Sequence, residues 1–141
     1  MTLKTNQYNL TTKRYQISKM KKIMDDNNFI TFLISLKDIY GDHGAVGLII
    51  LKKIDNNKKL FIDTFLMSCR ATGRYFESNM FNYLKIFAIK NNYKKIVGEF
   101  IKSEKNSVVK NLLRKHGFKK VKNKYICNSN KIKTFNQKIY E

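Results

Sequence analysis

The chain contains no proline and no tryptophan, and it has only six glycines and two cysteines. Two cysteines, Cys69 and Cys127, are too few for the disulfide framework of a small secreted protein, so a reducing compartment is favoured. No apolar run approaches the roughly 18 residues that a membrane helix needs. Residues 1–9 also lack the apolar segment of a signal peptide. We therefore expect a soluble, cytoplasmic protein with no membrane partner.

Acidic residues are few beside basic ones. Lysine and arginine together number 29 against 10 aspartates and glutamates, which leaves a net charge of +19. Such a charge fits an acidic partner, for example nucleic acid, a phosphorylated cofactor or an acidic carrier protein. The alternative is drift in composition, because lysine and asparagine are abundant and the lysines are spread along the chain. We favour drift, with electrostatic attraction of acidic partners as a side effect.

Motifs of several functional classes are missing. The sequence has no CxxC, HExxH, EF-hand, Walker A or GxSxG motif, so we expect no metal site and no serine triad. It also has no RRM, zinc-finger or homeodomain signature, which argues against a nucleic-acid partner. Hydrophobic residues make up 43% of the chain, which is enough to build an ordinary core.

Hydrophobic patterns predict a single α/β (α+β) domain over residues 1–127 and a polar tail at 128–141. The predicted order of elements is β-α-β-β-β-α-β-α-β-β, a mixed central sheet flanked by helices. One parallel crossover is expected, and it passes through the second helix. We expect the strands at residues 6–15 (a strand or an extended arm), 29–36, 45–51, 60–67, 95–101, 119–122 and 124–127.

Short turns join the predicted strands where glycine, aspartate and asparagine gather. Residues 37–44 would connect 29–36 to 45–51 as a hairpin. A second turn at 55–57 leads into the strand at 60–67. These three strands are therefore expected to form an antiparallel meander.

Three helices are expected on similar grounds. Ser18 is a candidate N-cap for the first helix, and Gly117 is a candidate C-cap for the third, which would begin at about Asn106. The second helix would run from about Tyr75 to residues 91–92 and is amphipathic. Its predicted buried stripe consists of Phe76, Met80, Tyr83, Leu84 and Phe87.

The stretch from residue 60 to residue 87 carries the clearest functional signal. A strand passes through a polar turn at 68–74 into the long amphipathic helix. Free backbone N–H groups and the positive end of the helix dipole at such a turn favour an anion such as phosphate. The alternative is an ordinary strand–helix turn that carries surface arginines, Arg70 and Arg74.

The element order and this turn resemble the GNAT acyltransferase (acyl-CoA N-acyltransferase) fold. The pyrophosphate loop of that family has the pattern [RQ]-x-x-G-x-[GA]. In this chain the pattern falls on Arg70-Ala71-Thr72-Gly73-Arg74-Tyr75, with tyrosine in place of the final glycine or alanine.

The resemblance is closer to one subgroup, the GNAT-like C-terminal domain of FkbH-type proteins. Those proteins load a glyceryl unit onto an acyl carrier protein in polyketide and related secondary-metabolite pathways. The DxDxT motif of their preceding HAD-type phosphatase domain is not in this sequence, which predicts a stand-alone relative or a fragment. The shared stretches are KTNQYNLTTKRY at 4–15, SLKDIYGDHGAVGLIIL at 35–51, IDTFLMSCRATGR at 62–74, and residues 98–118.

The resemblance implies that the chain uses CoA or the phosphopantetheine of an acyl carrier protein. Asn106 lies where relatives place a polar residue in contact with the pantetheine arm, although an N-cap role explains it equally well. Leu113 lies where many relatives carry a tyrosine that acts as general acid, and an alkyl side chain cannot donate a proton. The implied cofactor-binding residues are Phe65, Met67, Arg70, Thr72, Gly73, Arg74, Tyr75 and Asn106.

Three residues are candidates for catalysis. Cys69 follows the strand and precedes the helix, where a thiolate would be stabilised, so it can hold a transient acyl thioester. Its alternative role is that of a small buried hydrophobe. Asp63 and Glu99 are charges within predicted strands that lie side by side in the GNAT arrangement, so either can be a general base. Their alternative role is a structural ion pair.

Three functions remain open at this point. The favoured one is transfer of an acyl group, including a glyceryl group, from or to a phosphopantetheine thioester of CoA or a carrier protein. The first alternative is a non-catalytic domain that docks a carrier protein for a separate HAD-type glyceryl-loading partner. The second alternative, nucleic-acid binding, is supported only by the net charge of +19.

Overall fold

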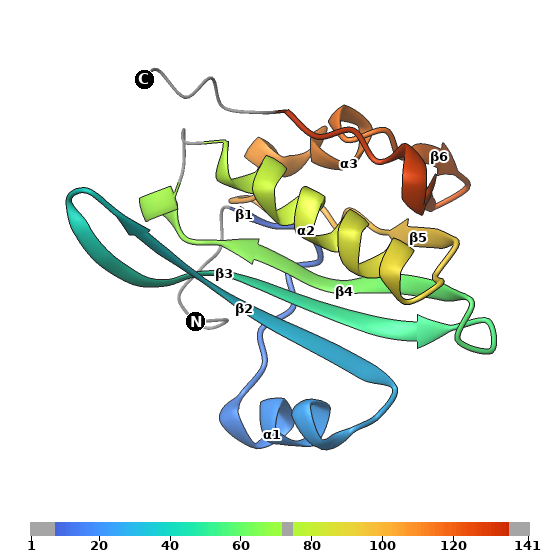
Figure 1. Cartoon of the computed structure of the whole chain (residues 1–141), viewed down its shortest axis with the longest axis horizontal. Helices are drawn as coiled ribbons and strands as arrows, with labels where there is room; N and C mark the ends of the chain where they lie inside the picture. The colour runs from blue at the N-terminus through green and yellow to red at the C-terminus, as the bar shows by residue number, and fades with distance from the viewer. Residues whose placement is uncertain (1–7, 72–74, 136–141) are drawn as a thin grey trace.

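The computed structural model describes residues 8–71 and 75–135. Its centre is a seven-stranded sheet with the order β2-β3-β4-β5-β7-β6, and β1 pairs with β4 outside this path. Figure 1 shows helix α2 lying along the sheet and α1 below β2, on the other side of the strands from α2. The strands are β1 Tyr8–Asn9, β2 Phe29–Asp38, β3 Gly41–Ile54, β4 Lys59–Met67, β5 Lys95–Gly98, β6 Lys119–Val121 and β7 Lys124–Asn128. The helices are α1 Ile17–Asp25, α2 Phe76–Lys90 and α3 Leu112–Lys115, with 3-10 turns η1 Cys69–Ala71, η2 Ser107–Val109 and η3 Ser129–Lys131.

Strand alternation divides the apolar residues of β3 and β4 between the two faces of the sheet. On one face, Ile49 and Phe65 belong to the main core, which includes α2. On the other face, Leu48 and Leu66 form a smaller cluster with Ile23 of α1. Both faces of the central strands are therefore covered, which explains why β4 reads as an almost continuous apolar run.

The predicted mixed sheet and its element order are confirmed. Strands β2, β3 and β4 form the antiparallel meander, and β4 pairs in parallel with β5 after the crossover through α2. One connection differs from its prediction, because β2 and β3 continue to Asp38 and Gly41. The Asp38 carboxylate accepts a hydrogen bond from the Tyr40 N–H (2.8 Å), and this local bond tightens the turn that was predicted over 37–44.

Two helix predictions are wrong in detail. Helix α1 begins after Gln16 without a side-chain cap, so Ser18 is not its N-cap. The third predicted helix is broken into η2 and α3. Gly117 does end α3 in the left-handed region, with φ of 92°. The predicted C-terminal strand pair is confirmed as β6 and β7.

The buried side of α2 is centred on a residue that the predicted stripe omits. Phe81 is fully buried, and its ring stacks on Phe65 with 4.8 Å between centroids. Tyr83, which the stripe includes, is 52% exposed. The stripe is confirmed at Phe76, Met80 and Leu84, which are buried. The buried face extends toward Phe81 because its ring lies between β4 and the His116 ring, with 4.0 Å between the two ring centroids.

His116 makes the stability of this core depend on pH. The imidazole is fully buried, and Nδ1 donates to the Lys133 carbonyl (2.7 Å). Burial lowers its pKa from the ordinary value, the positive charge of Lys115 lowers it further, and the Lys133 carbonyl and Glu77 partly offset both effects.

We therefore expect the free energy of unfolding to fall as the pH drops below about 6.5, the ordinary pKa of histidine. The unfolded chain binds the proton more readily than the folded chain, so protonation favours unfolding, with a slope of at most about 1.4 kcal/mol per pH unit. Urea unfolding between pH 5 and 7.5 measures the slope. His116→Phe keeps the aromatic stack and should lose this part of the slope, and an identical slope in the variant would contradict the prediction.

Residues 129–135 lie against α2. Ser129 and Ile132 are buried, and Lys85 Nζ donates to the Ile132 carbonyl (3.1 Å). The predicted domain boundary between residues 127 and 128 stays a prediction. Within residues 8–71 and 75–135, no helix has the length and apolar character that crossing a membrane requires.

Candidate functional site

The parallel pairing of β4 with β5 ends early. The last paired residues are Phe61 and Val97, and the two chains diverge beyond them. The edge of β4 that β5 leaves is taken by β1, which pairs antiparallel with Leu66 and Met67. A gap between diverging strands thus exists, and it opens toward the turn that follows β4.

The N-terminal segment 8–11 fills this gap. The Leu10 N–H donates to the Phe65 carbonyl of β4 (3.2 Å), and on the other side the Leu10 carbonyl accepts from the Ile101 N–H (2.9 Å). The Thr11 hydroxyl donates to the Asp63 carbonyl (2.8 Å). The segment therefore bonds the chain on both sides, as a strand inside a sheet does.

Asn106 completes the far side of the gap. Its Nδ2 donates to the carbonyls of Asn9 (2.9 Å) and Ile101 (2.8 Å), and its Oδ1 accepts from the Ser103 N–H (2.7 Å). The side chain makes no capping bond to η2, so the N-cap alternative is wrong. Its contact with a pantetheine arm stays a prediction.

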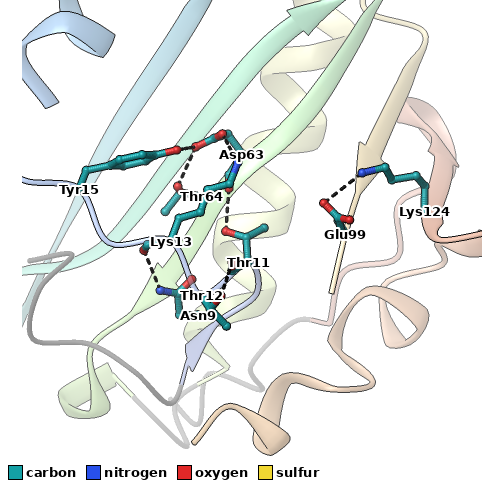
Figure 2. Close-up of polar contacts among 9 residues, drawn as sticks. All are labelled: Asn9, Thr11, Thr12, Lys13, Tyr15, Asp63, Thr64, Glu99 and Lys124. Carbon is teal, nitrogen blue, oxygen red and sulfur yellow. Dashed lines mark hydrogen bonds and ion pairs between the residues drawn. The ribbon is translucent and has the colours of Figure 1, made fainter. Parts of the chain in front are cut away.

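Asp63 is the centre of a buried polar cluster (Figure 2). Its carboxylate pairs with Lys13 Nζ (2.6 Å) and accepts hydrogen bonds from the hydroxyls of Tyr15 (2.7 Å) and Thr64 (2.9 Å). Burial raises the pKa of Tyr15, and the bond to Asp63 raises it further, so the phenol keeps its proton and donates. Asp63 thus forms the structural ion pair that was its alternative role. Its role as a general base stays a prediction.

Glu99 follows the end of β5 and is also paired. Its Oε2 lies 3.0 Å from Lys124 Nζ on β7. Figure 2 draws this ion pair as a dashed line. The ring of Phe61 lies beneath both pairs, with its centroid 5.0 Å from Lys124 Nζ and 5.9 Å from Lys13 Nζ. Sequence reasoning missed Lys13, Tyr15 and Lys124. The first two lie in the stretch 4–15, whose resemblance to FkbH-type proteins was the available signal.

The turn after β4 places Cys69 at the surface. Cys69 is exposed in η1, so the alternative of a small buried hydrophobe is wrong. The Arg70 guanidinium donates to the carbonyls of His43 (2.9 Å) and Ala45 (3.4 Å), which ties the turn to β3. Its predicted contact with phosphate stays a prediction. Thr72, Gly73 and Arg74 lie outside the described residues.

No protein-family model matches the sequence, and no curated protein matches it. Solved structures do match. The ribosomal-protein-S18-alanine N-acetyltransferase from Escherichia coli superposes with a TM-score of 0.66 at 7% identity, over 94% of this chain and 86% of that one. The spermidine N-acetyltransferase from Vibrio cholerae, solved with CoA and spermine, superposes with a TM-score of 0.64 at 15% identity, over 84% of this chain and 79% of that one. Tetrahymena GCN5 superposes with a TM-score of 0.60 at 12% identity, over 84% of this chain and 79% of that one.

The chain has the GNAT fold. The predicted fold is thereby confirmed, whereas the link to FkbH-type proteins stays a prediction. At sequence identities of 7% to 15%, the similarity shows a shared fold and does not show a shared substrate.

Two residues mark where this GNAT fold departs from the pattern of the family. Tyr75 precedes α2 in the left-handed region, with φ of 52°, where a glycine is favoured. The backbone thus has a glycine-like conformation although the residue carries a half-exposed ring. Leu113 is buried against Gly98, where an added Cβ would lie 2.9 Å from its Cδ1. Leu113 is therefore a packing residue.

Phe65 and Met67 contribute to this GNAT core through their side chains and to the gap through their backbone. Both side chains are buried. The Phe65 carbonyl bonds Leu10, and Met67 pairs with Tyr8. Within the described residues, no group of three or more histidine, cysteine, aspartate or glutamate side chains is placed to hold a metal ion.

Proposed function

We propose that this chain is a GNAT-type acyltransferase that acts on a phosphopantetheine thioester carried by CoA or by an acyl carrier protein. The observation that carries the proposal is the divergence of β4 and β5 after Phe61 and Val97, with the exposed Cys69 in the turn that follows β4. The matching spermidine N-acetyltransferase was solved with CoA, which supports CoA as the carrier of the arm.

The resemblance to FkbH-type proteins extends the proposal. It suggests a glyceryl group as the cargo, an acyl carrier protein as the acceptor and a HAD-type glyceryl-loading domain as a partner. A cytoplasmic location in secondary-metabolite biosynthesis belongs to the same proposal. These specifics rest on the sequence stretches at 4–15 and 62–74.

The proposed chemistry is thioester exchange at Cys69. The Cys69 thiolate attacks the acyl carbonyl, a bond from Sγ to the acyl carbon forms, and the bond from that carbon to the donor sulfur breaks. The donor leaves as a thiol after it takes up the proton that Cys69 released. The acceptor then attacks the acyl-cysteine, its bond to the acyl carbon forms, and the bond from that carbon to Cys69 Sγ breaks. Glu99 or Asp63, once separated from its lysine, would accept the proton of the acceptor and pass it to the departing Cys69 sulfur, which restores the thiol.

Cys69→Ala is expected to lower acyl transfer from acyl-CoA to a carrier thiol by at least about a hundredfold, because the nucleophile is lost. Intact-mass spectrometry should show the acyl adduct on the wild-type chain and none on the variant. Cys127→Ala is the matched control, because Cys127 is buried and burial raises the pKa of its thiol. Undiminished transfer by Cys69→Ala would remove the nucleophile role.

A second candidate function is non-catalytic docking of an acidic carrier protein. It is favoured by one observation, namely that segment 8–11 fills the gap while Lys13 and Lys124 pair with both candidate bases. The net charge of +19 suits such a partner. Mixing the chain with labelled CoA, carrier protein and DNA across a salt series separates the readings. Turnover supports the transferase, carrier binding without turnover supports docking, and a steep salt slope on DNA alone supports nucleic-acid binding.

A further inference from the structure

The gap between β4 and the chain after β5 holds segment 8–11 through hydrogen bonds to its backbone amide groups. It offers an acceptor at the Phe65 carbonyl and donors at the Ile101 N–H and the Asn106 amide. At present the backbone of segment 8–11 satisfies all three. A phosphopantetheine arm contains two amides and has the same kinds of donor and acceptor as a peptide strand.

We propose that segment 8–11 is an internal stand-in for the thioester arm, and that the arm binds by displacing it. This inference rests on the proposed function and adds a gate to the same site. The segment and the arm compete for the same backbone groups, so the two cannot occupy the gap together.

Three features of segment 8–11 and its flanking residue favour its release from the gap. Strand β1 is only two residues long. Thr12, the next residue after the segment, is β-branched and has φ of 59°, a strained conformation that release would relax. Asn9 Oδ1 is buried and has no hydrogen-bond partner among the described residues, and release would return it to water. Both unfavourable features belong to the docked state.

The contacts of Leu10, Thr11, Lys13 and Tyr15, which we call the latch, oppose the release of segment 8–11. Leu10 is fully buried, and the Thr11 hydroxyl bonds the Asp63 carbonyl. Just beyond the segment, Lys13 and Tyr15 both hold the Asp63 carboxylate. Release that extends to Lys13 therefore frees this carboxylate as well. Displacement by the arm would thus uncover a candidate base at the moment when the thioester arrives.

The probe for the test is CoA, added to the full chain. Residue-resolved hydrogen exchange should show the Leu10 amide losing protection when CoA binds, because it no longer donates to Phe65. The Ile101 amide should stay protected, because the arm accepts its bond. Global opening of the domain would instead expose both amides.

Thr11→Val removes one latch bond without changing the side-chain volume, so CoA should bind about fivefold more tightly. Thr31→Val is the matched control, because the Thr31 hydroxyl is buried and, within residues 8–71 and 75–135, has no hydrogen-bond partner that its loss would affect. CoA affinity should be unchanged in this control. Isothermal titration calorimetry of the wild-type chain and both variants measures the three affinities.

Two failures can be told apart. If CoA binds while the Leu10 amide stays protected and Thr11→Val has wild-type affinity, the gate is wrong and the proposed function survives. If neither the wild-type chain nor Thr11→Val binds CoA or transfers an acyl group, the proposed function fails and the gate fails with it.

Discussion

Replacing Asp63 with alanine is expected to lower the free energy of unfolding by about 3 kcal/mol. The Asp63 carboxylate is buried and accepts from Lys13, Tyr15 and Thr64, so alanine leaves three donors without their acceptor. The loss includes the ion pair with Lys13, whose side chain is two-thirds covered and whose ammonium group would lose this counter-charge. Urea unfolding followed by circular dichroism measures the change.

The control for this prediction is an aspartate with a similar ion pair at the surface. Asp55 lies 3.1 Å from Lys59 Nζ, but the Asp55 side chain is 52% exposed, whereas Asp63 is buried. Asp55→Ala should therefore cost no more than about 0.5 kcal/mol. Asp63→Asn should fall between the two alanine variants, because it keeps an acceptor oxygen for Tyr15 and loses the charge beside Lys13. Equal losses for Asp63→Ala and Asp55→Ala would show that the cluster does not stabilise the fold.

Asp63 also illustrates how far the sequence carries a prediction of the site. A charge in the middle of an apolar strand indicates a partner or a cleft, and both alternatives were open from the sequence. The partner itself, Lys13, lies 50 residues away in the chain. No sequence pattern connects Asp63 with Lys13, because the chain has many lysines and nothing in the sequence distinguishes the one that contacts Asp63.

Local patterns were sufficient where the structure depends on local preference. The meander, the turn at Asp55–Asn57 with its three left-handed residues, and the crossover helix follow from alternation and turn chemistry. The third helix failed because a distant contact overrides its apolar periodicity. The amide of Asn106 is held by Asn9 and Ile101, and the chain forms a 3-10 turn from there. The occupied gap was missed for the same reason, since segment 8–11 reads only as extended.

Phe81→Ala is expected to have the largest effect on stability, a loss of about 4 kcal/mol. The ring is fully buried in the centre of the core, where it stacks on Phe65 and on His116. Alanine would leave a cavity between α2 and β4, and the stacking partners on both sides of the ring would lose their contacts. Urea unfolding at pH 8, well above the ordinary pKa of histidine, keeps His116 neutral in both states and isolates the packing contribution.

Tyr83→Ala is the matched control on the same helix. For this variant the sequence pattern and the structure predict different losses of stability. The predicted stripe contains Tyr83 and omits Phe81, so from the pattern alone Tyr83→Ala should be the damaging change. Tyr83 is instead 52% exposed, and its ring contact is the edge of Phe32 at 5.2 Å, so we expect a loss of about 1 kcal/mol or less. A larger loss for Tyr83→Ala than for Phe81→Ala would mean that α2 is rotated on the sheet.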